Sequence, residues 1–314
     1  MKRLLTIIAA LTFAAATFTA KAQSIEPAGS YLFAEKDGQE LYLDVYEPAR
    51  GSQTSIDGKE KPTVIFVFGG GFKEGQRDAA YYSPWFKAMT DRGLRVISID
   101  YRLGLKDAKT MGVRQADELH KAILMAVEDL YSATAFLIGN AEEFDVDPEN
   151  IVISGSSAGA ITAMQAEYEI CNNGSLTSIL PEGFRYAGVM SFSGAVYSGN
   201  GKVSYKKDPC PILMFHGEED RLVTYKQIRF FSKHFAGASW LAKRFARKGY
   251  NYSFYHFQNI AHEVCNSMLQ NINEEMHFIE NNVMKGQKRI VDAAVNDPSI
   301  QKASWGNSGP KDIY

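Results

Sequence analysis

The stretch that decides the fold is IVISGSSAGA, residues 151–160. It begins with a β-branched apolar run, Ile151 to Ile153, which is typical of a buried strand. The glycine-flanked segment Gly155-Ser156-Ser157-Ala158-Gly159 follows, and a helical pattern comes next. A G-x-S-x-G motif between a strand and a helix predicts a sharp turn that holds out a serine oxygen, here that of Ser157. A plain glycine-containing loop is the alternative, and the rest of the chain must decide between the two.

Apolar runs alternate with helical patterns along the chain. Strands that are apolar throughout are typical of a parallel sheet covered on both faces. The run LYLDVY instead alternates at period two after the turn Asp37-Gly38, which predicts an antiparallel pair at the N-terminal end. We therefore expect an α/β fold with a mostly parallel central sheet, antiparallel N-terminal strands and helices on both faces. The other expected strands are 63–68, 95–100, 150–154, 187–192, 211–216 and 251–257, and the expected helices are 83–92, 113–139, 158 onward and 266–285.

The ends of the chain carry separate signals. Lys2-Arg3, an apolar run to Phe18 and the step Ala20-Lys21-Ala22 predict a secretory signal peptide over residues 1–22. An N-terminal membrane anchor is the alternative, but the run is short for a spanning helix, which needs about 20 residues. The sequence thus predicts an exported protein, periplasmic or secreted and without a stable membrane anchor. Residues 23–314 are expected to form a single domain with a polar tail from about residue 287.

Composition narrows the classes of partner. The 314 residues are 45% hydrophobic and carry a formal net charge of −2, so no overall charge favours binding to nucleic acid or to an anionic membrane. The three cysteines, Cys171, Cys210 and Cys265, lack the spacing of a metal site, and their pairing in an oxidising compartment stays open. Neither a metal nor an organic cofactor is expected, and the sequence does not indicate an oligomeric state.

A serine hydroxyl needs a base beside it to act as a nucleophile. His262 lies a few residues after the strand NYSFYHF, in a loop that leaves the carboxyl edge of the predicted sheet. An orienting carboxylate is expected at the same edge, where the strand PILMFH ends in Gly217-Glu218-Glu219-Asp220; Asp220 is preferred and Glu219 comes next. Packing or surface roles are expected for the histidines in predicted helices, which are His120, His234 and His277. The same is expected for His256, which lies within a predicted strand.

A glycine run supplies a possible site for a developing oxyanion. The strand TVIFVF leads into Gly69-Gly70-Gly71, whose backbone N–H groups can turn toward negative charge together with that of Ala158. The run lacks the spacing of a dinucleotide-binding loop and the Gly-Lys-Ser/Thr of a P-loop.

With these motifs the chain resembles the esterase and lipase branch of the α/β-hydrolases, which includes the hormone-sensitive-lipase-like bacterial carboxylesterases. The resemblance implies that Ser157 is the nucleophile, Asp220 the triad acid and His262 the base, with an oxyanion hole at Gly70, Gly71 and Ala158. The sequence departs from the family at Phe68, where a histidine is usual, and at Ser156, where many relatives have aspartate. The matching pieces are FGGGF (68–72), DYRLG (100–104), FDVDPENIVISGSSAGA (144–160), HGEEDRLV (216–223) and AHE (261–263).

The resemblance implies a carboxylesterase that cleaves a small-molecule or polysaccharide-linked ester through an acyl-enzyme. Removal of acetyl or feruloyl groups from plant polysaccharide and general short-chain ester hydrolysis are both open. A serine peptidase of the prolyl-oligopeptidase type and a noncatalytic binding protein on this fold are the alternatives. Activity is expected to fall as His262 becomes protonated, near the ordinary imidazole pKa of about 6.5.

Overall fold

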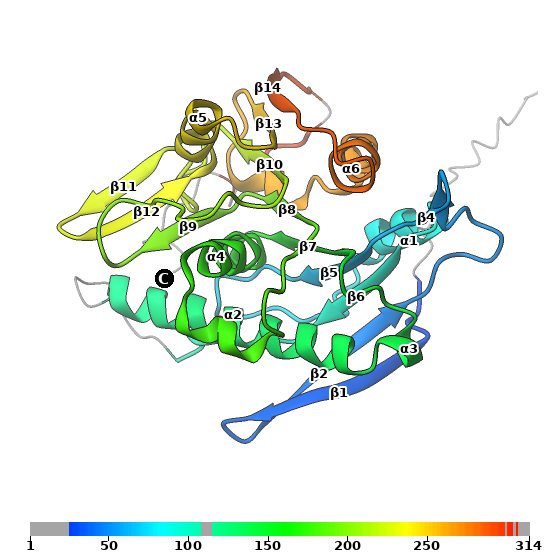
Figure 1. Ribbon diagram of the computed structural model, residues 1–314. Helices are drawn as coiled ribbons and strands as arrows, with labels where there is room; N and C mark the ends of the chain where they lie inside the picture. The colour runs from blue at the N-terminus through cyan, green and yellow to red at the C-terminus, as the bar shows by residue number, and fades with distance from the viewer. Residues whose placement is uncertain (1–24, 108–114, 299, 304–305, 307–314) are drawn as a thin grey trace, which may run out of the picture.

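A nine-stranded sheet forms the centre of the computed structural model (Figure 1). The structure describes residues 25–107, 115–298, 300–303 and 306, so the predicted signal peptide lies outside the described residues. The strand order is β1-β2-β6-β5-β7-β8-β10-β13-β14. The strands of this sheet are β1 (Gly29–Lys36), β2 (Gln39–Tyr46), β5 (Thr63–Val67), β6 (Arg95–Ile99), β7 (Ile151–Ser156), β8 (Gly188–Phe192), β10 (Ile212–Gly217), β13 (Tyr252–Phe257) and β14 (Ile290–Val295).

The strand directions match the predicted fold class. The pairs β1–β2 and β2–β6 are antiparallel, whereas the pairs from β6 through β14 are parallel. The expected mostly parallel sheet with antiparallel N-terminal strands is therefore confirmed. Two smaller sheets flank it: β11 (Gln227–Phe230), β12 (Lys233–Gly237) and β9 (Ala195–Ser198) form one, and β3 (Ser55–Ile56) and β4 (Lys59–Glu60) form the other.

Helices lie on both faces of the sheet (Figure 1). Helices α2 and α4 pack together on one face, and α1 packs near α6 on the other. Helix α2 is long and apolar enough to cross a membrane, but more than half of its apolar window is buried and it packs against α4 and β1. We therefore interpret α2 as a core helix. The helices are α1 (Ser83–Asp91), α2 (Gln115–Gly139), α3 (Ala141–Phe144), α4 (Ala158–Asn172), α5 (Ala238–Lys248) and α6 (Ile272–Phe278).

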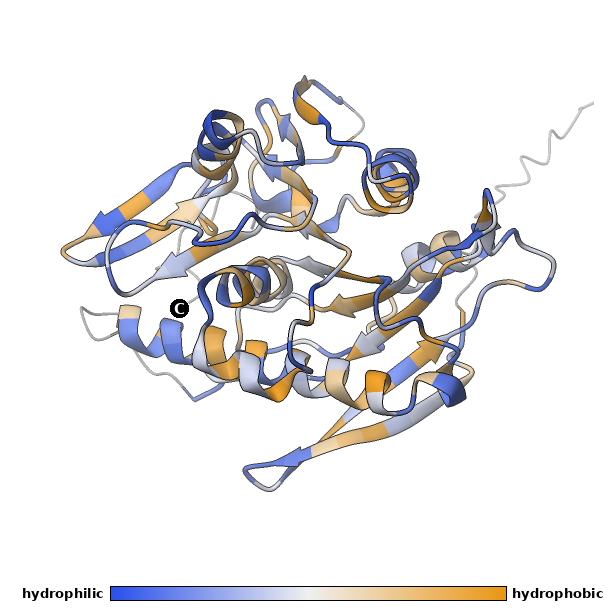
Figure 2. Cartoon of the chain, viewed as in Figure 1, coloured by the Kyte–Doolittle hydropathy of each residue, from blue (hydrophilic) through white to orange (hydrophobic). Residues whose placement is uncertain are grey.

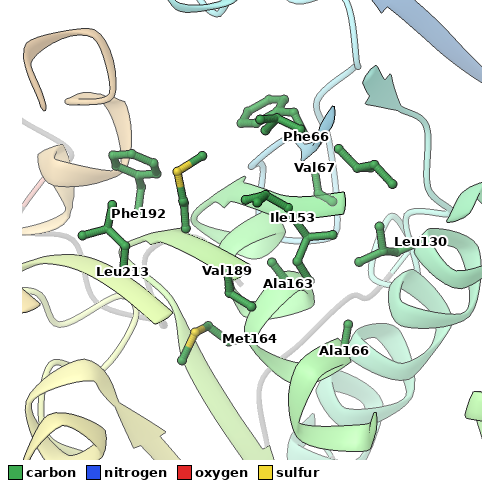
Figure 3. Close-up of a cluster of buried hydrophobic side chains, with 14 of the residues drawn as sticks. Phe66, Val67, Leu130, Ile153, Ala163, Met164, Ala166, Val189, Phe192 and Leu213 are labelled. Atoms are coloured by element: carbon green, nitrogen blue, oxygen red, sulfur yellow. The ribbon is translucent and has the colours of Figure 1, made fainter. Parts of the chain in front are cut away.

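The core lies between the central strands and α4. Figure 3 shows Ile153 and Val189 of the sheet close to Ala163 of α4, with Leu130 of α2 beyond. The hydropathy colouring in Figure 2 shows the central strands as mainly apolar. The small side chain of Ala163 lies between α4 and the strands and lets the helix approach the sheet closely, whereas Ala166 lies beside α2.

Three regions differ from the sequence-based expectation. Residues 290–295 were predicted to belong to a patternless polar tail, but they form β14, which pairs in parallel with β13. Exposed and half-buried residues alternate along this edge strand, so it lacks the continuous apolar run of a central strand. His234 was predicted in a helix but lies in β12. The single helix expected at 266–285 is instead a series of shorter pieces: 3₁₀ turns at 262–266 and 269–271, then α6, then a π turn at 279–284.

Candidate active site

The turn at Ser157 joins β7 to α4 and has an unusual backbone. Ser157 has φ 52° and ψ −115°, a conformation that costs a non-glycine residue roughly 1–3 kcal/mol. The chain passes so close to β5 here that a Cβ on Gly159 would lie 1.9 Å from the carbonyl oxygen of Val67. The motif is therefore a strained strand–turn–helix elbow, as predicted, and not a plain loop.

The elbow brings Ser157 to a histidine that is 105 positions away in the sequence. The Oγ of Ser157 lies 2.8 Å from Nε2 of His262, and Nδ1 of His262 lies 2.8 Å from Oδ2 of Asp220. All three side chains are largely buried; Ser157 is the most exposed at 9%. The Asp220 carboxylate requires a proton on Nδ1, so in the neutral ring Nε2 is unprotonated and can accept the serine proton. The structure thus brings together the three residues that the sequence singled out.

The alternative acid does not take part in this arrangement. The Glu219 side chain is 47% exposed and lies 3.9 Å from the Lys302 ammonium at the surface. The loop after β10 instead turns Asp220 inward, because its Oδ1 accepts the backbone N–H groups of Leu222 and Val223 at 3.0 and 2.9 Å.

His216 is a second histidine on the same carboxylate, and the sequence analysis assigned it no role. Its Nε2 lies 3.2 Å from Oδ2 of Asp220 and 3.0 Å from the carbonyl oxygen of Val223. Within the described part of the chain its Nδ1 has no hydrogen-bond partner. Burial opposes ionisation of Asp220, but hydrogen bonds from His216 and His262 outweigh it and lower the pKa of that carboxyl. Asp220 is therefore held as a carboxylate that faces two imidazoles.

The pKa of His262 is raised above its ordinary value. Burial works against protonation, while Cys265 and the Asp220 carboxylate favour it and prevail. Cys265 is buried and lies on the same 3₁₀ turn as His262. The sequence indicated no role for Cys265, since nothing in its spacing distinguishes it from a packed core cysteine.

This pKa shift leads to a prediction for the pH dependence. His262 must be neutral to accept the serine proton, so a raised pKa moves the acid limb of kcat/KM above the value of about 6.5 expected from the sequence. The profile is measured with a soluble p-nitrophenyl ester. Cys265→Ala is expected to shift the limb to lower pH, because it removes one of the groups that raise the pKa. A wild-type limb at or below about 6.5 would contradict the account.

The glycine loop follows β5 and lies beside Ser157. Gly70 has φ 126°, and a Cβ there would lie 1.9 Å from the carbonyl oxygen of Glu74, so only glycine fits. The N–H of Gly69 already donates to the Tyr82 hydroxyl at 2.9 Å. Among the described residues no hydrogen bond occupies the N–H of Gly70 or Gly71, and Ala158 supplies the first N–H of α4. The assignment of these three N–H groups to an oxyanion hole, which the resemblance implied, stays a prediction.

Phe68 occupies the position where relatives have histidine, and it supports the loop by packing. Its ring stacks on that of Tyr101 with centroids 4.3 Å apart, and Phe68 itself is 2% exposed. The Tyr101 hydroxyl donates to the Phe68 carbonyl oxygen at 3.1 Å. An aromatic stack and one hydrogen bond therefore hold the start of the glycine loop.

A pocket of about 710 Å³ opens over these groups. Tyr81 and Tyr82 line one part of it, and Leu222, Lys106 and Asn266 line others. Tyr81 is 60% exposed, so its ring is accessible to a ligand. Trp85 and Phe86, which follow the two tyrosines in the sequence, are each 1% exposed and belong to the core.

The C-terminal segment fastens the loop that carries His262. The Glu263 carboxylate accepts the N–H of Ala261 through Oε2 and that of Ala303 through Oε1, both at 3.0 Å. The N–H of His262 donates to the carbonyl oxygen of Gly306 at 3.2 Å. Glu263 was passed over in the sequence because an acid beside a candidate histidine normally lies in solvent, whereas here it is 5% exposed.

Glu263→Ala is expected to lower kcat about 10- to 100-fold with little change in KM, because the His262 backbone loses its tether while the substrate pocket is kept. Glu263→Gln keeps one acceptor oxygen and should recover part of the loss. Glu219→Ala, which removes an exposed carboxylate nearby, is the matched control. Steady-state kinetics with a soluble ester measure all three variants. A kcat of Glu263→Ala equal to that of wild type would contradict the role of Glu263 in holding the His262 loop.

Comparisons with known proteins identify the family of the chain. The family model described as phospholipase/carboxylesterase matches residues 112–280, which is more than half of the chain. The chain belongs to the phospholipase/carboxylesterase family. A second family model, BD-FAE, matches residues 43–173 of this family member. The expected α/β-hydrolase carboxylesterase family is thus confirmed.

Solved structures show the same fold. Esterase 2 of the planctomycete Thermogutta terrifontis, with propionate bound, superposes with a TM-score of 0.57 at 17% identity and covers 82% of this chain and 95% of its own. The apo form gives 0.57 at 18% identity, with 84% and 98% covered. At this identity the likeness concerns the fold alone.

Curated relatives match over shorter stretches. Fumonisin B1 esterase of Sphingopyxis macrogoltabida is 29% identical over 126 residues, 38% of this chain and 21% of that protein. Carboxylesterase 5A of Felis catus is 30% identical over 122 residues, 39% of this chain and 20% of that protein. The match therefore spans about a fifth of the length of these relatives, which support an ester-hydrolysing enzyme as the sequence predicted.

Within the described residues no group of three or more His, Cys, Asp or Glu side chains is arranged to hold a metal ion. The three cysteines are recorded as free thiols in the buried interior.

Proposed function

We propose that the protein is an exported serine carboxylester hydrolase. The observation that carries the proposal is the hydrogen-bonded series Ser157–His262–Asp220, which opens into a pocket beside a glycine loop. Membership of the phospholipase/carboxylesterase family supports it. Export rests on the signal-peptide pattern of residues 1–22 alone.

In the first half of the reaction the Ser157 oxygen attacks the ester carbonyl carbon while Nε2 of His262 takes its proton. The carbonyl oxygen becomes an oxyanion that accepts hydrogen bonds from the N–H groups of Gly70, Gly71 and Ala158. Loss of one such donor typically costs about 10²–10³ in rate. The imidazolium then gives its proton to the departing alcohol, which leaves an acyl group on Ser157.

In the second half water takes the place of the alcohol. His262 removes a proton from the water, the resulting hydroxyl attacks the acyl carbonyl, and the proton passes to the Ser157 oxygen as the carboxylic acid leaves. Asp220 stabilises the His262 imidazolium in both half-reactions and holds the Nδ1 proton of that ring in place.

The substrate class we propose is an acetyl or feruloyl ester of a polysaccharide, with short-chain esters as the second candidate. The accessible Tyr81 ring at the pocket offers a stacking surface for an aromatic acyl group, and this observation favours a feruloyl ester. A simple short-chain esterase does not need that ring.

A substrate panel tests the proposal. The mature protein is assayed with p-nitrophenyl acetate and butyrate, a feruloyl ester and acetylated xylan, and a Tyr81→Ala variant is assayed in parallel. We expect hydrolysis of the p-nitrophenyl esters, with a selective loss on the feruloyl ester in Tyr81→Ala. Folded protein that cleaves none of these esters would favour the binding-protein alternative, and cleavage of a prolyl peptide instead would favour the peptidase.

A further inference from the structure

The hairpin formed by β11 and β12 exposes large apolar side chains in a short segment. Ile228 is 53% exposed, Phe230 51% and Phe231 87%. The hairpin lies at the outer edge of the β9–β12 sheet, where β11 has no partner on its other side (Figure 1). Exposed apolar residues scattered singly need no explanation, but three within four positions at one hairpin tip form a patch.

The turn of this hairpin breaks the usual turn chemistry. Phe230 pairs with Lys233, so Phe231 and Ser232 form a two-residue turn. Such turns favour asparagine or glycine at positive φ, whereas Phe231 has φ 51° here. The rings of Phe230 and Phe231 contact each other with centroids 4.5 Å apart. An exposed aromatic residue with a strained backbone at this turn indicates that Phe231 has a role other than stabilising the fold.

The hairpin is also cationic. The segment KQIRFFSK, residues 226–233, contains Lys226, Arg229 and Lys233 and no acidic residue. Lys233 pairs with Asp117, whereas Lys226 and Arg229 are exposed. Burial lowers the pKa of the neighbouring His234 to about 4, and the positive charges of Arg229 and Lys202 add to this shift. The small net charge of the whole chain conceals this local excess.

We propose that the hairpin of residues 226–233 docks the protein on an anionic lipid surface. Phe230, Phe231 and Ile228 enter the boundary between headgroups and acyl chains, while Lys226 and Arg229 remain at the level of the anionic headgroups. Exposed apolar side chains with cations beside them are the combination that binds an anionic lipid surface.

Charge disfavours a second copy of the chain as the occupant. Pairing of two β11 edges would place Lys226 and Arg229 of one copy beside the same residues of the other, where like charges repel. A neutral polysaccharide would gain nothing from these cations. An anionic lipid surface uses both the aromatic tip and the charge.

Docking would also orient the active site. Leu222 lines the catalytic pocket and β11 begins five residues later, so the hairpin starts a short length of chain from the pocket. This part of the inference rests on the proposed function, since it places ester groups at or near a lipid surface within reach of Ser157.

Cosedimentation with vesicles tests the docking independently of catalysis. The mature protein is mixed at low salt with vesicles of phosphatidylcholine alone or with phosphatidylglycerol added. We expect binding to the anionic vesicles only. Phe230→Ser/Phe231→Ser is expected to lower the partition coefficient at least tenfold, and Lys226→Gln and Arg229→Gln about fivefold each with a weaker salt dependence. Leu32→Ser, which removes an apolar side chain that is 45% exposed on β1, is the matched control and should bind like wild type.

Three outcomes would overturn the proposal. The first is equal partition of wild type and the double phenylalanine variant onto anionic vesicles. The second is wild-type protein that binds insoluble xylan but not vesicles, with xylan binding lost in the variant, and the third is a concentration-dependent dimer that the variant abolishes. Hydrolysis of a soluble p-nitrophenyl ester monitors folding and should be unchanged in every variant. Loss of vesicle binding with retained hydrolysis bears on docking alone, and absence of hydrolysis with retained vesicle binding bears on the proposed function alone.

Discussion

Replacement of Ser157 by alanine is expected to reduce ester hydrolysis roughly 10⁴–10⁶-fold, because it removes the hydroxyl oxygen that lies 2.8 Å from Nε2 of His262. The residual rate over water would come from the oxyanion donors and substrate binding. The fold should be kept, since the strained backbone of the elbow is set by the glycines and by packing against β5 and not by the Ser157 hydroxyl. Steady-state kinetics with p-nitrophenyl acetate provide the measurement.

Ser156→Ala is the matched control within the same motif. Ser156 is buried, and its hydroxyl donates to the Cys265 carbonyl oxygen at 2.8 Å. Its loss should cost one hydrogen bond, about 0.5–1.5 kcal/mol of stability, and change activity far less than the loss of Ser157 does. Equal losses in the two variants would show that the assay reports damage to the elbow and not removal of a nucleophile.

Asp220→Asn is expected to lower kcat about 10⁴-fold at neutral pH. The carboxylate accepts hydrogen bonds on both sides: from the imidazoles of His262 and His216 through Oδ2, and from two backbone N–H groups through Oδ1. In one orientation the amide NH₂ faces the imidazoles, so His262 loses the acceptor that fixes its tautomer. In the other it faces the backbone N–H groups of Leu222 and Val223, and in both orientations the negative charge that stabilises the imidazolium is lost. Kinetics over a range of pH measure the effect.

Glu219→Gln distinguishes the two acids of this loop. Its side chain is half-exposed and distant from the histidine arrangement, so activity should stay near that of wild type. Loss of activity in Glu219→Gln with retention in Asp220→Asn would reverse the assignment of the triad acid.

The site could be predicted from the sequence because one physical rule places its parts. In a parallel sheet the carboxyl ends of the strands meet at one edge, so residues just after β5, β7, β10 and β13 come together although they are far apart in the chain. Gly70, Ser157, Asp220 and His262 each follow one of these strands. The continuous apolar runs that defined the strands were strong signals, since a strand buried on both faces has few polar residues.

The parts that could not be predicted depend on tertiary contacts. β14 is an edge strand with an interrupted apolar pattern, and β11 is exposed along its whole length, so neither has a periodic signal. Glu263 matters because Ala303 lies next to it, and this proximity arises only when the C-terminal segment folds back. His216 did carry a signal that was not used: it ends a strand at the same edge as Asp220.

Labelling with a fluorophosphonate tests most directly the central claim that Ser157 is an activated nucleophile. Wild-type mature protein is treated with the probe, its intact mass is measured, and the modified peptide is sequenced by tandem mass spectrometry. The account predicts a single adduct on Ser157, which is absent in Ser157→Ala and strongly slowed in Asp220→Asn. Folded wild-type protein that acquires no adduct, or an adduct on another residue that persists in Ser157→Ala, would contradict it.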